Sequence, residues 1–183
     1  MNIVWLIVLI LVLIAAWFIL TYNGLVGLRN RVEEAWSDIE VQLKRRYDLI
    51  PNLVNTVKGY ATHESSVFEN VAAARSVAMG ARTPAEHAQA ENALSQSLKS
   101  LFAVAEAYPQ LQAAGNFAQL QTELADTENK IESSRRFYNG SARDYNSKLQ
   151  SFPTNIIAGS FAFTKKEYFT APDEVNTAPT VQF

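Results

Sequence analysis

The stretch that most constrains the fold is an uninterrupted apolar run over residues 3–20. Its eighteen residues would reach about 27 Å as an α-helix, close to the roughly 30 Å hydrocarbon core of a bilayer. Fourteen of them are Ile, Val, Leu or Phe, and the rings of Trp5, Trp17 and Tyr22 lie near the two ends, where aromatic side chains favour the headgroup region. The sequence therefore predicts a transmembrane anchor over residues 1–22.

A buried core helix and a cleaved signal peptide are two other interpretations of this run. A core helix seldom contains eighteen successive apolar residues. A signal peptide has a basic start, a shorter apolar stretch and small residues before its cleavage site, whereas this run ends in Trp17-Phe18-Ile19-Leu20. The chain has no cysteine, which excludes lipoprotein attachment. An uncleaved single-pass anchor is the interpretation that fits.

Basic residues set the expected orientation of the anchor. None precedes the apolar run, whereas Arg29 and Arg31 follow it closely and Lys44-Arg45-Arg46 lies further on. Because Lys and Arg accumulate on the cytoplasmic side of membrane helices, we expect the N-terminus outside the cell and the body in the cytoplasm. The absence of Cys is consistent with a reducing compartment.

The remaining 160 or so residues are enough for one domain with its own core. Sixteen basic and eighteen acidic residues give a net charge of −2, which argues against a nucleic-acid partner. Only seven glycines and six prolines occur, mostly at boundaries between periodic segments. This composition is typical of a helical protein, so we predict an all-α fold.

Apolar residues spaced by three and four positions predict a series of amphipathic helices. The first runs from Leu25 to Ile50 and continues the anchor without a flexible linker. Pro51 lacks the N–H that a helix needs and disfavours helical geometry at Ile50. The chain could form one helix that is kinked at Pro51 or two helices that are separated there. We expect two helices, because a break at Pro51 gives segments of the similar lengths that a helix bundle requires. A second helix is expected to end at Met79-Gly80, with Gly80 available for a left-handed cap.

The next two boundaries have clear local signals. Thr83 is expected to cap a helix that has Pro84 in its first turn and Glu86 completing a capping box. Tyr108-Pro109 ends that helix. The last long helix is expected to begin at Gly115-Asn116, with Asn116 as its cap.

This last helix carries a coiled-coil-like seam from Phe117 to Tyr145. The seam keeps its phase across Asn139-Gly140, so one continuous helix is predicted in spite of that turn-like pair. Its polar members are Thr127, Ser134 and Ser141.

Helical order weakens after Phe152-Pro153, although residues 155–159 could form one turn. The later aromatic residues are too apolar for a free tail and predict packing across the bundle; they are Phe161, Phe163, Tyr168 and Phe169. Pro172 and Pro179 suggest an extended end. The predicted organisation is a transmembrane anchor (1–22), an antiparallel four-helix bundle (23–152) and a C-terminal segment packed on the bundle (153–183).

No residue pattern in the sequence argues for catalysis. His87 and Glu91 lie four positions apart on one helical face and could share a metal ion, but a third ligand is missing. No phosphate-binding loop or nucleophile elbow occurs. We therefore expect no metal, no cofactor, no catalytic residue and no enzyme activity.

Aromatic and basic positions are the candidates for an interface. The Lys44-Arg45-Arg46 cluster lies about 36 Å beyond Leu20 in a straight helix, several times the Debye length of about 8 Å, so attraction to lipid would be screened. A solvated face or ion pairs between subunits is favoured there, and Arg135-Arg136 has the same two interpretations. The interface candidates are Trp36, Arg45, Arg46, Tyr47, Arg135, Arg136 and Phe169.

The sequence also resembles a known family. The stretch YNGLVGLRNRVEEAWSDIEVQLKRRYDLIPNLVNTVKGYATHES behind the anchor resembles the LemA family, as do Ala73-Ala74-Arg75, ESSRRFYNGSARDYNSKLQSFP and the segment from Phe163 to Phe169. The resemblance covers nearly the whole chain, and its most specific part is RYDLIPNLV. It implies a four-helix bundle on one membrane helix of a bacterial inner membrane, with the N-terminus outside. It supplies no mechanism.

Three hypotheses follow from the residues and the resemblance. The first is a non-catalytic, membrane-anchored scaffold that self-associates into a homo-oligomer and organises membrane. The second is an adaptor for a membrane protease or a TPM-domain protein, because the resemblance implies such neighbours; relatives also include a protein that helps to form magnetosome membranes. The third and most remote is an unrecognised enzyme.

Overall fold

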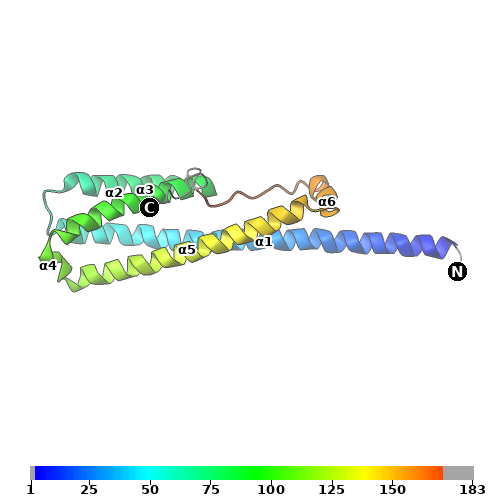
Figure 1. Ribbon diagram of the computed structural model, residues 1–183, viewed down its shortest axis with the longest axis horizontal. Coiled ribbons are helices and arrows are strands. Elements are labelled where there is room, and N and C mark those ends of the chain that lie inside the picture. The colour runs from blue at the N-terminus through cyan, green and yellow to red at the C-terminus, as the bar shows by residue number, and fades with distance from the viewer. Residues whose placement is uncertain (1–2, 171–183) are drawn as a thin grey trace, which may run out of the picture. The chain divides into compact units, whose positions relative to one another are not determined.

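The computed structural model describes residues 3–170, and every regular element in that range is a helix (Figure 1). The helices are α1 (Ile3–Lys58), α2 (Ser65–Gly80), α3 (Pro84–Glu106), α4 (Pro109–Gln112), α5 (Gly115–Gln150) and α6 (Thr154–Ser160). The prediction of an all-helical chain is confirmed for the described residues. The extended end that Pro172 and Pro179 suggested lies outside them.

Helix α1 joins the apolar run to the amphipathic segment without interruption. Gly24 and Gly27 lie inside it, and a side chain added at either glycine would meet no neighbouring atom within 4 Å. The prediction that the apolar helix passes directly into the next one is therefore confirmed.

The break expected at Pro51 is wrong, because α1 continues through that residue to Lys58. Proline removes the N–H that would bond the carbonyl of Tyr47, four residues earlier. In the structure Arg75 of α2 replaces the missing donor, since its Nε donates to the Tyr47 carbonyl oxygen at 2.7 Å. A residue 24 positions after the proline thus satisfies the carbonyl, and local sequence rules could not predict this.

The capping box at the start of α3 is confirmed. The backbone N–H of Glu86 donates to the Thr83 side chain, the Glu86 carboxylate accepts from the Thr83 N–H, and Pro84 stands in the first turn. The left-handed cap at Gly80 is wrong, because Gly80 is the last residue of α2 and Ala81 follows in an extended conformation. Asn116 lies one residue inside α5 rather than at its cap.

The chain divides into two compact units, which we call the first unit (residues 3–37 with 136–167) and the second unit (residues 38–135 with 168–170). Helices α1 and α5 contribute residues to both. The first unit buries an apolar set from α1, α5 and α6: Leu25, Val32, Ala35, Tyr138, Ala142, Tyr145, Leu149, Ile157 and Ala158.

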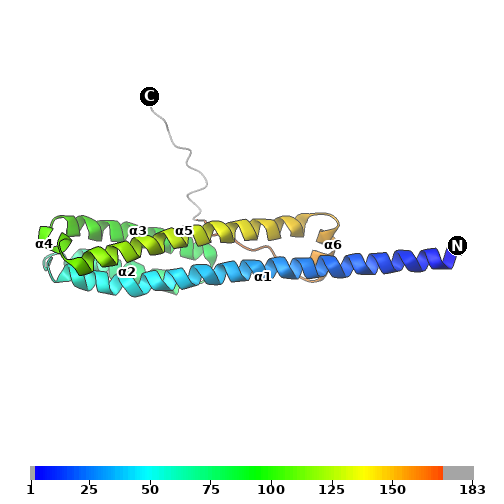
Figure 2. The same ribbon diagram turned by 90° about the horizontal axis from the view of Figure 1, so that it is seen from below.

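The second unit contains α2, α3 and α4 with parts of α1 and α5. In both Figure 1 and Figure 2, α2, α3 and these parts of α1 and α5 run alongside one another. Its largest fully buried side chains are Ile39, Leu43, Ile50, Leu53, Val57, Leu94, Leu101, Leu111 and Phe169. In the part of α5 that belongs to the second unit, most residues of the predicted seam face the core, and Thr127 and Ile131 are both buried.

Candidate functional site

The first candidate site is the apolar surface at the start of α1. Every residue from 3 to 20 is exposed, and Ile3 and Leu20 retain 75% and 73% of their accessible surface. The core helix of a soluble protein is mostly buried, whereas no part of the most apolar window of α1 is buried. By length and composition, α1 is the one helix within residues 3–170 that could cross a bilayer.

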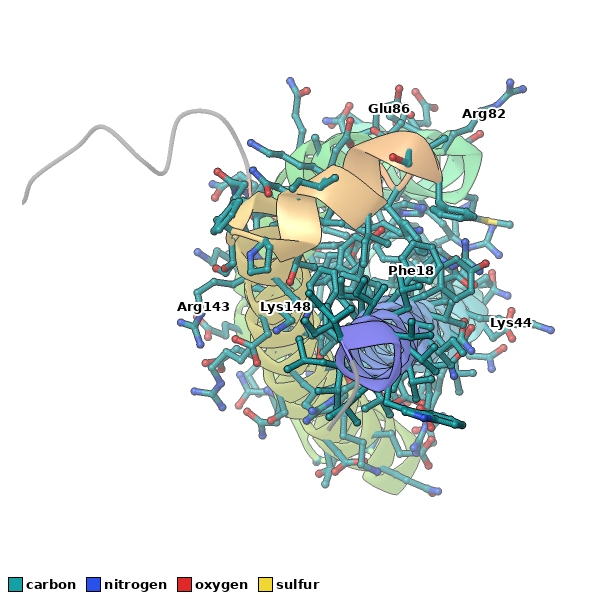
Figure 3. All side chains as sticks on the ribbon, turned by 90° about the vertical axis from the view of Figure 1, so that its right-hand side faces the viewer. Phe18, Lys44, Arg82, Glu86, Arg143 and Lys148 are labelled. Carbon is teal, nitrogen blue, oxygen red and sulfur yellow. The ribbon has the colours of Figure 1, made fainter. Side chains whose placement is uncertain are left out.

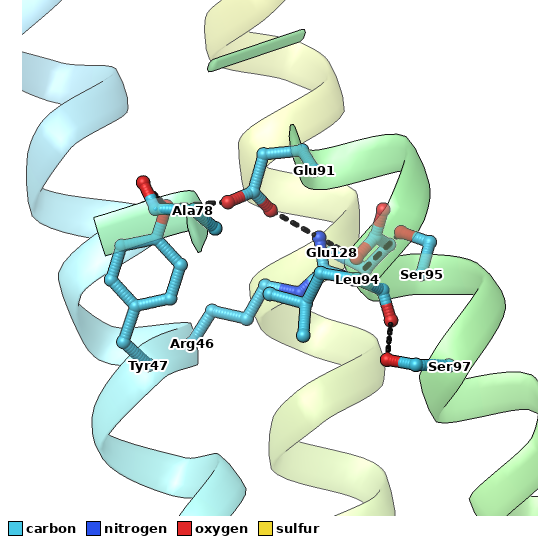
Figure 4. Close-up of polar contacts among 8 residues, drawn as sticks. All are labelled: Arg46, Tyr47, Ala78, Glu91, Leu94, Ser95, Ser97 and Glu128. Carbon is cyan, nitrogen blue, oxygen red and sulfur yellow. Dashed lines mark hydrogen bonds and ion pairs between the residues drawn. The ribbon is translucent and has the colours of Figure 1, made fainter. Parts of the chain in front are cut away.

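The second candidate site is a buried polar cluster in the second unit, centred on Arg46 of α1 (Figure 4). Arg46 is 3% exposed. Its Nη1 donates to Glu91 Oε2 at 2.7 Å, and its Nη2 donates to Ser95 Oγ at 2.7 Å. Glu128 Oε2 of α5 lies 3.1 Å from the same Nη1. One guanidinium therefore joins α1 to both α3 and α5.

Tyr47 completes the cluster from the next position along α1. Its hydroxyl donates to Glu91 Oε1 at 2.5 Å and lies 3.3 Å from the carbonyl oxygen of Ala78 in α2. Both oxygens of the Glu91 carboxylate are thus engaged, one by Arg46 and one by Tyr47. All four long helical segments of the second unit contribute to this cluster.

Burial sets the protonation behaviour of these groups. Desolvation raises the pKa of the Glu91 carboxyl above its ordinary value, because it outweighs the opposing influence of the Arg46 charge and the Tyr47 hydrogen bond. Desolvation also raises the pKa of Tyr47, and the nearby Glu91 carboxylate adds to that rise. Tyr47 consequently stays protonated and acts as a hydrogen-bond donor.

A cleft of about 340 Å³ opens beside this cluster, between α3 and α5. Its walls are mainly apolar and include Leu98, Phe102 and Leu124, while Arg46 and Glu128 lie at its polar part. These two ionisable groups already pair with each other, which favours a structural role over proton transfer.

The structure gives the predicted interface residues different environments. Arg46, Tyr47 and Phe169 are buried within the chain itself. The interpretation of Arg46 as part of a solvated face is therefore wrong, because Glu91 and Ser95 of α3 enclose it. The Arg135 guanidinium lies over the Phe169 ring, with its Cζ 4.7 Å from the ring centroid.

The other candidates are more accessible. Trp36 is half-buried in the first unit, where its ring meets Tyr138 edge-on at a centroid distance of 5.4 Å. Arg45 is exposed and lies 3.6 Å from Asp126, and Arg136 is also exposed. A role for any of these residues in contacts with another molecule stays a prediction.

The pair His87 and Glu91 does not form part of a larger ligand set. Glu91 is engaged by Arg46 and Tyr47. Within residues 3–170, no group of three or more His, Cys, Asp or Glu side chains is arranged to hold a metal ion.

The polar cluster could have been found from the phase of its charges. Arg46 lies three residues after Leu43 and four before Ile50, both buried, and Glu91 lies three residues before buried Leu94. A charge in phase with the apolar face of a helix is directed inward and needs a partner. The helical phase of Arg46 and Glu91 can be read from the sequence, although the sequence does not predict that these two side chains form an ion pair with each other.

The fold and these two sites define a class of protein: a helical chain with one apolar N-terminal helix that continues into a folded body. The model of the LemA family matches residues 35–183, and the chain belongs to the LemA family. The resemblance seen in the sequence is thereby confirmed.

Curated relatives carry two kinds of name. Magnetosome protein MamQ of Magnetospirillum gryphiswaldense is 28% identical over 88% of this chain and 69% of its own length. Magnetosome protein MamQ 2 of Paramagnetospirillum magneticum is 27% identical over the same shares. Protein LemA of Metamycoplasma hominis is 28% identical over 74% of this chain and 63% of its own length.

Proposed function

We propose that this protein is a single-pass, membrane-anchored and non-catalytic scaffold that assembles with copies of itself. The observation that carries the proposal is the continuity of α1. One helix begins as a fully exposed apolar run of bilayer length and ends inside a folded core, with the Arg46 cluster along its course. A tether would need only a flexible linker, whereas α1 itself supplies the buried residues Leu25 and Val32 to the first unit.

We further propose that the second unit is an antiparallel four-helix bundle. The Arg46 cluster supports this, because α1, α2, α3 and α5 each supply one of its groups. The relatives' names, which describe magnetosome and LemA proteins, support a role at membranes in place of a particular reaction. The basic residues after the anchor support a body in the cytoplasm.

Self-assembly is supported by apolar side chains that the second unit leaves exposed. Val77 and Met79 of α2 are 65% and 54% exposed. Val77 borders a groove of about 510 Å³ between α2 and α3, whose other walls include the small residues Gly80, Ala90 and Ala93. A helix from a second copy fits such a groove, since small residues allow close approach.

The test is the mass of the full-length protein in mild detergent, measured by light scattering on a sizing column. We expect one defined mass that is several times the 20.4 kDa of the chain. Val77→Glu should reduce that mass without loss of helical content, because it replaces an apolar wall of the groove by a second carboxylate beside Glu86. Ala72→Glu adds the same charge at an exposed position of the same helix and serves as the matched control.

A monomeric wild-type protein would contradict self-assembly while leaving the anchor untouched. The adaptor hypothesis would then account better for the chain, and partners would be sought in native membranes. Trp36 is less suitable for this test, because its contact with Tyr138 means that a charge there would also disturb the fold of the first unit.

A further inference from the structure

The first unit contains an uncharged segment after α5. Residues 149–164 include α6 and carry no Asp, Glu, Lys or Arg, whereas Lys148 precedes them and Lys165-Lys166 follows them. Residues 107–122 of the second unit form another uncharged stretch of the same length, so the segment after α5 is distinguished by its exposed apolar side chains and not by its lack of charge.

The uncharged segment exposes large apolar side chains. Phe152, Ile156 and Phe161 are 81%, 60% and 49% exposed. On the other side of α6, Ile157 and Ala158 are buried. The segment therefore has a protein-facing side that is already packed and a second apolar side that faces outward, which is an arrangement expected at an interaction surface.

Contacts within the first unit place this segment beside the end of the apolar run. The ring of Phe161 lies 5.7 Å from that of Phe18 and 5.1 Å from that of Tyr22. The ring of Phe163 lies 5.7 Å from that of Tyr22. Figure 3 shows Phe18 on the side of α1 that faces α6. Because Phe18 belongs to the apolar run itself, Phe161 is level with its last turn.

Basic residues stand where lipid headgroups would meet this surface. Arg29 is exposed, and its Cζ lies 5.6 Å from the centroid of the Phe163 ring. Lys148 and Lys165, at the two ends of the uncharged segment, are exposed as well. Exposed aromatic and aliphatic side chains flanked by Lys and Arg are typical of segments that lie in the interface of an anionic leaflet.

We propose that residues 151–163 are a second membrane contact, inserted into the same bilayer interface from which α1 emerges. The occupant of the exposed apolar side is lipid, and Phe152, Ile156 and Phe161 are the inserted side chains. This inference rests on the proposed anchoring of α1. A second contact restricts the rotation and tilt of the anchor, which a single helix leaves free.

The chain has no cysteine, so single cysteines can report on depth in the full-length protein. We would place a nitroxide label at Phe152→Cys or Ile156→Cys and reconstitute each variant in vesicles of equal parts phosphatidylcholine and phosphatidylglycerol. Collision of the label with oxygen, which concentrates in lipid, is compared with collision with a water-soluble nickel complex. Leu11→Cys, in the apolar run, is the lipid reference, and Ala72→Cys, exposed on α2 outside the proposed groove, is the water reference.

We expect the oxygen-to-nickel ratio at positions 152 and 156 to exceed the ratio at position 72 several-fold and to approach that at position 11. A ratio equal to that at position 72 would overturn the second contact, whereas a lipid-like ratio at position 11 would still support the anchor. Labels shielded from both reagents would also overturn it, because protein and not lipid would then cover the segment. A water-like ratio at position 11 would overturn the anchor, and the second contact with it.

Discussion

The two units differ in the polar groups that they bury. The second unit buries charged side chains, whereas the first unit buries aromatic rings and the amide of Asn146. Arg46, Glu91 and Tyr47 form the charged centre of the second unit. In the first unit Asn146 donates to the carbonyl of Lys166 at 2.8 Å and accepts from its N–H at 2.9 Å. The Tyr138 hydroxyl, nearby, donates to the carbonyl of Glu167 at 2.8 Å.

Because of this difference, the two units should tolerate substitutions to different degrees. The charged centre needs particular side chains at every position, because a buried ion without its partner is strongly unfavourable. The amide of Asn146 recognises only backbone atoms, so it fixes the path of residues 163–167 without restricting their side chains. Substitutions should therefore be far more costly in the second unit than along this C-terminal segment.

The largest effect is expected from Arg46→Met, which leaves Glu91 buried without its counter-charge. We expect the free energy of unfolding to fall by about 3–5 kcal/mol, measured by chemical denaturation in detergent. Arg45→Met is the matched control at the adjacent position; its contact with Asp126 is exposed and screened by water, so its loss should be much smaller. Equal losses in the two variants would contradict the structural role of the cluster.

The double variant Arg46→Met/Glu91→Met sharpens the first prediction. It removes both charges and replaces them by flexible apolar side chains, so a large part of the lost stability should return. If the double variant were less stable than Arg46→Met alone, the loss would come from packing and not from an uncompensated carboxylate.

A smaller effect is expected from Arg75→Met. Its Nε serves the Tyr47 carbonyl that Pro51 leaves without a helical partner, and a hydrogen bond from a charged donor contributes about 1.5–3 kcal/mol. Pro51→Ala restores a backbone N–H at that position, so Arg75→Met should cost much less in a Pro51→Ala background. A double-mutant cycle measures this coupling, and strictly additive losses would refute it.

In the first unit, Asn146→Ala removes two hydrogen bonds to the backbone of Lys166. We expect a loss of about 1–2 kcal/mol, together with faster amide hydrogen exchange at Lys166. Lys166→Ala keeps both backbone bonds and loses only a surface contact with Glu33, so its stability should stay within about 0.5 kcal/mol of wild type. Equal losses would show that the side chain, and not the backbone path, is what the unit recognises.

How far the sequence predicts this molecule depends on the range of the interaction. The apolar run and the box of Thr83 and Glu86 are local: the run lies in a helix long and apolar enough to cross a membrane, and the box is present. The helix across Pro51 was missed because Arg75, which makes it possible, lies on another helix. For Arg46 the sequence favoured a solvated face or ion pairs between subunits, and the burial of its side chain could be expected only from its phase on α1.

The smallest effect, and the one that isolates the charged centre most cleanly, is the dependence of stability on pH. The pKa of Glu91 is raised in the folded chain, so the folded state binds this proton more tightly than the unfolded state does. Its contribution is fully present below the ordinary carboxyl pKa and is lost as the pH rises through the raised value. Glu91→Gln should therefore remove a decline in unfolding free energy that sets in as the pH rises above the ordinary carboxyl pKa.

The control with the opposite sign is Glu86, whose pKa is lowered by hydrogen bonds from the backbone N–H groups of Arg82 and Thr83. Its contribution is present above the ordinary carboxyl pKa and is lost as the pH falls through the lowered value. Glu91→Gln should thus change the pH dependence of the unfolding free energy above the ordinary carboxyl pKa, and Glu86→Gln should change it with the opposite sign below that pKa. If both variants changed the pH dependence in the same direction, Glu91 would not be held in a desolvated site, and the contrast between a charged and a neutral interior would lose its physical basis.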